Sequence, residues 1–201
     1  MIFMIKKTPI LLTFLACSCA NSNLLELDYS SLAPMIKYSI LGEDFKIDAA
    51  FIEEKQYSFI KATVNNKVAI LTLSSVSRDG FYRWVASDNA VLITKNGKLI
   101  RSHGLFNDFE ILDADPFSHS ILMKLSNPNA IFEHTIEDTY TSLESNSNSL
   151  REYREVIRSK KLAWTKTNIY TYDGLLSLPL KTKQFIYPNE DAVEIEFYYK
   201  Y

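Results

Sequence analysis

Three histidines and a run of carboxylates are the side chains in this sequence that could hold a metal ion. The histidines do not follow the H-E-x-x-H spacing of a helical zinc site, so we expect surface or packing roles. They are His103, His119 and His134. The carboxylates are Asp108, Glu110, Asp113 and Asp115. A calcium loop needs a glycine at its bend, and none occurs within this run. We therefore expect a solvated acidic loop and no metal site.

Patterns typical of enzymes are not found in the sequence. A serine nucleophile of the hydrolase type needs a G-x-S-x-G turn, and a phosphate-binding loop needs clustered glycines. The chain has five glycines and neither pattern. Glycoside hydrolysis needs two carboxylates at a set separation, and no pair is marked out by its context. We expect a protein that is not an enzyme and needs no cofactor, with polysaccharide hydrolysis as the least favoured alternative.

Aromatic side chains could bind sugar rings by stacking. The candidates are Trp84, Trp164 and a late series of tyrosines, namely Tyr170, Tyr172, Tyr187, Tyr198, Tyr199 and Tyr201. Aromatic residues at strand spacing more commonly pack in a core, so both interpretations stay open for the group. For Trp84 we expect core packing that fixes one hairpin to its neighbour.

Both cysteines lie within the first twenty residues, so the rest of the chain forms no disulfide framework. Two lysines at positions 6 and 7 precede the apolar run Ile10–Ala16, which is the pattern of a secretory signal. This run is shorter than the roughly 20 residues that a membrane span needs. The letters FLAC at 14–17 resemble a bacterial lipobox, in which the cysteine receives a diacylglyceryl group.

Cys17 is the predicted lipid-attachment site, because Ala16 suits the cleavage position and the apolar run continues up to it. Cys19 is the alternative site, and an ordinary signal peptide with an incidental cysteine is the other alternative. An acylated cysteine carrying palmitate-type chains would hold firmly, since each buried CH₂ contributes about 0.8 kcal/mol.

The residues that follow the two cysteines bear on the destination of the chain. Neither Ser18 nor Ala20 is the aspartate that retains lipoproteins in the inner membrane. Resemblance to that sorting rule implies a periplasm-facing protein anchored in the outer membrane. We divide the chain into a lipoprotein signal peptide (1–16), a short tether (17–23) and one β-rich domain (24–201).

Composition agrees with one globular domain. The chain has 201 residues, of which 47 % are hydrophobic, so a sizeable core can form. The net charge is −2, which removes the electrostatic footprint of a nucleic-acid-binding protein. The aromatic content of 13 % favours β structure.

The order of the elements follows from periodicity and turn residues. Apolar positions near helical spacing predict a helix within 24–41. Two-residue turns are predicted at Asn65-Asn66, Asn96-Gly97 and Asp173-Gly174, with another turn at 78–80. The strands they join are 57–64, 67–76, 81–86, 90–94, 98–101 and 164–172. Further strands are predicted at 131–141 and 192–201, a polar loop at 142–149, and either helix or strand at 150–159. We expect an antiparallel sheet forming a sandwich or open half-barrel, with the N-terminal helix packed on it.

One hairpin carries a resemblance to a known family. The residues concerned are Trp84, Asp88, Asn89, Ala90, Asn96, Gly97, Lys98, Leu99, Gly104 and Leu105. They resemble the signature of the YjbF/GfcB lipoproteins, with Lys98 in place of the common arginine. The hairpin around 164–174 and the last strand resemble the end of that family. The signature residues are expected to set the fold and register of the hairpin.

The resemblance implies an outer-membrane lipoprotein, with a mostly antiparallel β fold, that assists the export of exopolysaccharide or group 4 capsule without catalysis. Its expected partners are the outer membrane, which it contacts through the lipid anchor, and an outer-membrane export component or the polysaccharide. The alternative function is a carrier or chaperone for lipid or lipoprotein, with an open β half-barrel around an apolar cavity.

Overall fold

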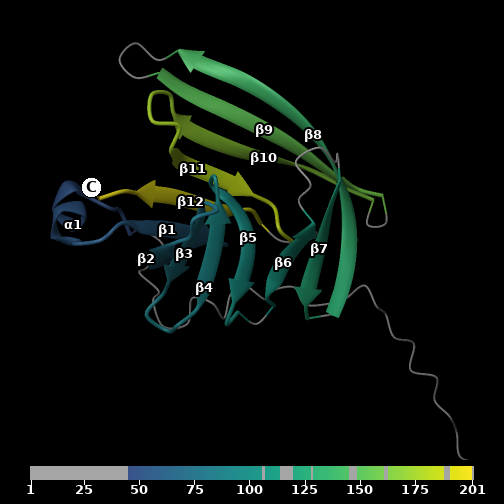
Figure 1. Cartoon of the computed structure of the whole chain (residues 1–201), viewed down its shortest axis with the longest axis horizontal. Coiled ribbons are helices and arrows are strands. Elements are labelled where there is room, and N and C mark those ends of the chain that lie inside the picture. Colours follow the sequence, from purple (N-terminus) through teal and green to yellow (C-terminus); the bar gives the residue numbers. More distant parts are fainter. Residues whose placement is uncertain are drawn as a thin grey trace, which may run out of the picture.

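In the computed structural model the chain forms one twelve-stranded antiparallel sheet and one short helix (Figure 1). The described residues are 45–105, 107–113, 120–127, 129–144, 149–160, 163–187 and 191–200. The elements are α1 (Ala49–Glu54), β1 (Phe59–Val64), β2 (Lys67–Val76), β3 (Phe81–Val85), β4 (Val91–Lys95), β5 (Lys98–His103), β6 (Phe109–Asp113), β7 (Ser120–Ser126), β8 (Asn129–Glu144), β9 (Ser149–Ser159), β10 (Trp164–Asp173), β11 (Pro179–Gln184) and β12 (Val193–Tyr198).

The sheet closes into a barrel, because β1 pairs with both β2 and β12. Each of the strands β2–β11 pairs with the strands before and after it in sequence. The expectation of a sandwich or an open half-barrel is therefore wrong. Alternation along a strand shows which side chains share a face but not which strand lies beside it, so the closing pair Ile60↔Phe197 could not be inferred.

Closure gives the barrel two ends, which differ in what they carry. We call the end that holds α1, the end of β12 and the turns after β2, β4 and β10 the α1 rim. The other end, with the turns after β1, β3, β5 and β9, is the far rim. Because each strand runs opposite to its neighbour, each connection is assigned to one rim by sequence order alone.

The single described helix is short and exposed. Asp48 caps α1, since its side chain accepts a hydrogen bond from the backbone N–H of Phe51 at 2.8 Å. The ring of Phe51 contacts Phe59 at the start of β1, with the ring centroids 5.7 Å apart. The helix predicted within 24–41 lies outside the described residues.

The hydrophobic core fills the part of the barrel bounded by β1–β7 and β12. Trp84 is fully buried there, stacked on Tyr82 and edge-on to Phe197. Its indole N–H donates to Thr94 Oγ1 at 2.9 Å, which satisfies the polar atom of an otherwise apolar ring. The prediction that Trp84 packs in the core is confirmed. Burial of each large apolar side chain contributes roughly 1.5–3 kcal/mol to stability.

Three predicted turns are confirmed. Asn65-Asn66 joins β1 to β2 with φ angles of 48° and 61°, and Asn96-Gly97 joins β4 to β5 with φ angles of 49° and 78°. Positive φ at both positions is the requirement of a type I′ turn. The turn at 78–80 joins β2 to β3, with Gly80 at φ 78°.

Other segments differ from the prediction. Asp173 does end β10, but β11 starts only at Pro179, so the connection is longer than a two-residue turn. Inside it Ser177, and not Gly174, is the residue with positive φ. The segment at 150–159 is a strand, and the region predicted as a polar loop includes the end of β8 and the start of β9. Part of the predicted acidic loop is β6, because Ile111 there pairs with Met123 of β7.

Candidate functional site

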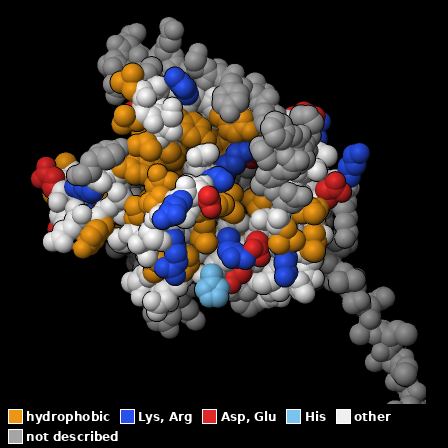
Figure 2. Space-filling view, viewed as in Figure 1, with side chains coloured by type: hydrophobic (Ala, Val, Ile, Leu, Met, Phe, Trp, Pro, Cys, Tyr) orange, Lys and Arg blue, Asp and Glu red, His pale blue; other side chains and the backbone are white. Residues whose placement is uncertain are grey.

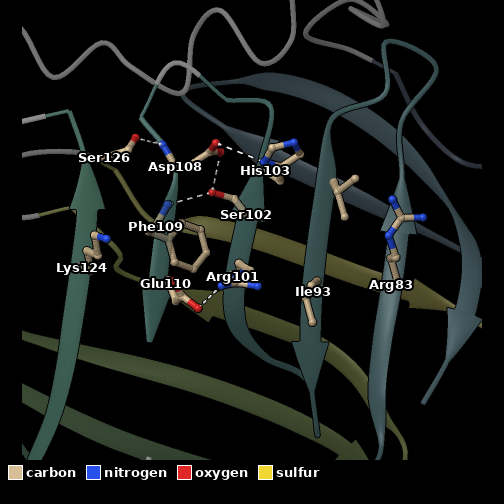
Figure 3. A pocket seen from close by; sticks show the side chains of 11 residues that line it. Arg83, Ile93, Arg101, Ser102, His103, Asp108, Phe109, Glu110, Lys124 and Ser126 are labelled. Atoms are coloured by element: carbon tan, nitrogen blue, oxygen red, sulfur yellow. Dashed lines mark hydrogen bonds and ion pairs between the residues drawn. The ribbon is translucent and has the colours of Figure 1, made fainter. Parts of the chain in front are cut away.

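A charged groove of about 470 Å³ lies on the outer face of the barrel, across β3–β7 (Figure 3). Figure 2 shows Lys and Arg side chains interleaved with Asp and Glu over these strands. Its floor is one row of five side chains, each directly opposite the next on the neighbouring strand. The row is Arg83, Ile93, Arg101, Glu110 and Lys124.

The register explains why these five side chains share one face. Directly opposed residues in antiparallel strands point to the same side of the sheet. The adjacent pair Trp84↔Leu92 is buried inside the barrel, so Arg83 and Ile93 face outward. Four strand spacings of about 4.8 Å separate the first and last members, so the row is about 19 Å long.

The row carries three cations and one carboxylate. Arg101 forms an ion pair with Glu110, and Lys124 lies opposite the same carboxylate on β7. Arg83 donates to Ser74 Oγ at 3.2 Å, which directs its guanidinium to one edge of the row. The pairs are solvent-exposed, so each contributes on the order of 0–1 kcal/mol to stability. The groove therefore presents three cations that contribute little to the stability of the fold.

One end of the groove is held rigid by Asp108. Its carboxylate accepts hydrogen bonds from the backbone N–H groups of Gly104 and Leu105, at 3.1 and 3.0 Å, and from Ser102 Oγ at 3.1 Å. Ser102 Oγ in turn accepts from the N–H of Phe109 at 3.0 Å. Ser102 and Asp108 thus shape the β5–β6 turn, and their polar atoms are occupied by it.

The signature residues between β3 and β4 form a second tight turn, at the far rim. Asp88 Oδ1 accepts from the N–H of Ala90 at 3.0 Å, and Asn89 has φ 68°. Gly104, at φ 83°, lies against this turn, since a Cβ there would be 3.5 Å from Ala90 Cα. Leu105 beside it is buried. These residues therefore connect the β3–β4 turn to the β5–β6 turn.

The signature residues between β4 and β5 reach across the barrel interior. Gln184 of β11 donates from Nε2 to the carbonyl of Gly97 at 2.9 Å, and its Oε1 accepts from the N–H of Leu99 at 2.8 Å. Tyr172 donates to the carbonyl of Asn96 at 2.9 Å. A Cβ on Gly97 would lie 2.8 Å from Cβ of Pro179, so only glycine fits there. We call the tip Asn96–Leu99 together with Gln184, Glu155, Asn168 and Tyr170 the interior latch.

A buried carboxylate completes the interior latch. Glu155 of β9 accepts hydrogen bonds from Lys98 Nζ at 2.5 Å, from the hydroxyl of Tyr170 at 2.8 Å and from Asn168 Nδ2 at 3.0 Å. Burial, followed by the charge of Glu155, raises the pKa of Tyr170 well above its usual value. Phe185 N–H donates to Asn168 Oδ1, which ties the chain after β11 into the same network. The sequence analysis missed Glu155, Asn168 and Gln184, because polar residues on a strand look the same whether they face solvent or a barrel interior.

Beside the interior latch is a cavity of about 70 Å³. Residues of the interior latch form part of its lining, together with six isoleucines, namely Ile100, Ile111, Ile121, Ile136, Ile157 and Ile186. A water molecule occupies about 30 Å³ in the liquid, so this space holds about two waters. Figure 2 shows hydrophobic side chains gathered near this region, between the start of β5 and β10–β11.

The predicted site residues fall in several places. Cys17, Cys19, His119 and Asp115 lie outside the described residues. His103 borders the charged groove, whereas His134 is buried, and burial lowers its pKa. Within the described part of the chain, no three His, Cys, Asp or Glu side chains are grouped so as to hold a metal ion. Trp164 is also buried, between strands and beside His134, so it does not offer a ring face for stacking on a sugar.

With this geometry established, comparison with known proteins places the chain in a family. Residues 30–145, more than half of the chain, match the family described as group 4 capsule polysaccharide lipoprotein GfcB, YjbF. The chain belongs to this lipoprotein family. The match includes every signature residue from Trp84 to Leu105, and it ends before the hairpin around 164–174.

A solved structure has a similar fold. It is the crystal structure of the hypothetical lipoprotein YmcC from Escherichia coli, with a TM-score of 0.61 and 19 % sequence identity. The similarity covers 78 % of this chain and 91 % of that one. Comparison with curated proteins gives no match. No helix within the described residues has the length and apolar character needed to cross a membrane.

Proposed function

We propose that this protein is a lipid-anchored lipoprotein of the outer membrane that faces the periplasm and assists the export of exopolysaccharide or capsule without catalysing a reaction. The observation that carries the proposal is the family match over residues 30–145. Lipid attachment is at Cys17, with Cys19 as the alternative. Lipobox-like letters at 14–17 support this placement independently of the family match.

The charged groove is the part of the barrel best suited to contact a polymer. Arg83, Arg101 and Lys124 present three cations along about 19 Å, a spacing that suits acidic groups repeated along a chain. Each contact is exposed and therefore weak, so a polymer bound here can also be released. A non-catalytic role is supported by the carboxylates present, since Glu110 is paired with Arg101 and Asp108 is bonded to the backbone.

The test removes the cations and keeps the barrel. The variant R83A/R101A/K124A is compared with R158A/K181A/K183A, which removes three exposed cations from β9 and β11. Affinity electrophoresis in gels that contain the acidic polysaccharide of the producing cell measures binding. We expect retardation of the parent protein and the control variant, and loss of retardation for the groove variant.

The matching measurement in cells is the amount of polymer on the cell surface. Loss of surface polymer with the groove variant, but not with the control, supports the proposal. Equal retardation of both variants contradicts a role for the groove. Unchanged surface polymer after removal of the whole protein contradicts the export function itself, and shortening of the purified polymer by the protein contradicts the non-catalytic role.

The lipid-carrier alternative is not favoured by the interior of the barrel. The barrel is closed, and the cavity beside the interior latch holds about 70 Å³. That is the volume of about two waters, far less than an acyl chain occupies. Gln184 and Glu155 also fix the tip of the β4–β5 hairpin across the space in which such a chain would lie.

A further inference from the structure

We propose that the α1 rim of the barrel rests on the lipid surface to which the chain is anchored, with Leu175 and Leu176 inserted between the lipid headgroups. This inference rests on the proposed lipid anchor, and it adds an orientation that the anchor alone does not determine. A tether fixes where a domain is attached but not which of its surfaces meets the membrane.

The first observation is the uneven distribution of exposed apolar residues. Seven large hydrophobic side chains are exposed among the described residues. Two lie in the turn after β10, one just before β1, one at the end of β2, and two near the β6–β7 connection. All six therefore lie at or near the α1 rim: Leu175, Leu176, Tyr57, Val76, Leu112 and Leu122. Ile131, near the start of β8, is the exception.

The second observation is that the most exposed pair projects from an ordered turn. Leu175 and Leu176 are 89 % and 62 % exposed. Their backbone N–H groups both donate to Asp173 Oδ1, at 2.8 and 2.7 Å. The carbonyl of Asp173 also accepts from the N–H of Ser177 at 3.0 Å. Scattered exposed leucines are normal on a protein surface. Two consecutive leucines on a turn fixed by a carboxylate are an insertion element that is formed before it meets lipid.

The third observation is where the chain from the anchor joins the barrel. The described chain begins at Phe45, whose ring contacts Phe51 of α1 with centroids 5.3 Å apart. Residues that precede it lead back to Cys17 and Cys19. The chain therefore enters the barrel at the same rim that carries the exposed leucines. The entry point thus lies on the side that the proposal places against the lipid.

Cations at the same rim lie beside aromatic rings. Lys55 Nζ is 4.4 Å from the centroid of Phe51, and Lys95 Nζ is 4.6 Å from that of Phe81. Lysine stems that run along an apolar surface with the ammonium group outward are typical of membrane interfaces. Acidic residues are present as well, including Asp79 and Glu53, so apolar insertion and not net charge is the main attraction.

Depth-dependent fluorescence quenching tests the orientation on the full acylated chain in vesicles. Leu175→Trp places a reporter on the turn, and Asn129→Trp places one at an exposed position near the far rim. Trp84 and Trp164 are buried and give the background, which the parent protein measures. With lipids brominated on their acyl chains, we expect the Leu175→Trp reporter to be quenched and the Asn129→Trp reporter to keep its intensity.

A second variant measures the contribution of the leucines. When the acylated chain is extracted from vesicles by detergent titration, L175S/L176S is expected to leave the membrane more easily, by about tenfold in partition coefficient for each leucine. The matched control is I131S, the exposed apolar residue away from this rim.

The outcomes separate this inference from the proposed function. Vesicle-bound protein with equal, weak quenching at both reporters overturns the orientation and leaves the anchor intact. Full-length processed protein that stays off vesicles overturns the anchor. Loss of export in L175S/L176S without quenching at Leu175→Trp assigns the turn to a protein partner and also overturns the inference.

Discussion

Two ion pairs of the same chemical type have opposite environments in this barrel. Lys98–Glu155 belongs to the interior latch, where the Glu155 side chain is 5 % exposed. Arg101–Glu110 lies in the charged groove, where the carboxylate is 34 % exposed. Only two residues separate Lys98 from Arg101 on β5, yet one side chain joins two walls of the barrel and the other faces outward.

Burial decides what each pair does. A buried carboxylate depends on its partners, because removing one leaves an uncompensated charge away from water. An exposed pair exchanges readily with water, so its members remain available to a ligand. The difference indicates that the interior latch maintains the shape of the barrel while the groove serves recognition. Variants of the two sites should therefore differ in how strongly they change stability.

The largest effect is expected from Lys98→Met. Glu155 would keep the hydrogen bonds from Tyr170 and Asn168 but lose its only cation among the described residues. We expect the free energy of unfolding in urea to fall by about 3 kcal/mol. The double variant K98M/E155Q, in which no charge remains buried, should recover part of that loss. A loss below about 0.5 kcal/mol for Lys98→Met would show that the latch is dispensable.

The next largest effect is expected from Gly97→Ala. The new Cβ would lie 2.8 Å from Cβ of Pro179, and the backbone would keep a positive φ that alanine disfavours. A destabilisation of about 1–3 kcal/mol should follow, measured by thermal unfolding. Gly80→Ala is the matched control, because it has the same φ of 78° but no atom within 4 Å of its Cβ. Equal effects for the two variants would show that backbone strain alone, and not the approach to β11, limits position 97.

Gly97 also shows which features of the fold can be predicted from the sequence and which cannot. Asn96-Gly97 predicts its turn because the requirement for positive φ is local. The approach of Gly97 to Pro179 depends on residues more than eighty positions away, and alternation in β11 does not reveal it. The fold was predicted as antiparallel β for the same local reason, whereas barrel closure depends on the pairing of the first and last strands.

The candidate site follows the same rule. The histidines and acidic residues can be recognised as candidate metal ligands from their residue types alone. Arg83, Arg101 and Lys124, in contrast, form one row only through the register of five strands. Each is an ordinary exposed strand residue when considered alone. A signal was available in the alternation of Lys and Arg with apolar neighbours on β3, β5 and β7, but it does not specify which rows align.

The third prediction concerns acid sensitivity at His134, a buried residue of β8, the strand next to the groove row. Burial lowers the pKa of His134 below its usual 6.5, so the folded protein binds fewer protons than the unfolded chain in that range. Stability should therefore be constant above about pH 6.5 and decrease as the pH falls below it. His134→Phe, which can still pack beside Phe132 and Trp164, should remove this decrease. Urea midpoints at pH 7.5, 6.5 and 5.5 measure it, and an unchanged slope in His134→Phe would contradict the assignment.

The smallest effect on stability is expected in the groove. The single variants Arg101→Ala and Glu110→Ala, with the double variant, form a cycle whose coupling free energy should be below about 1 kcal/mol, because both side chains are exposed. Binding to acidic polysaccharide should change in the opposite sense for the two variants. Arg101→Ala removes a cation and weakens binding, whereas Glu110→Ala frees Arg101 from its partner and strengthens it. Raising the salt concentration should reduce both differences. A coupling of 3 kcal/mol, or weaker binding by Glu110→Ala, would place this pair with the interior latch as a structural element and would remove the distinction between the two sites.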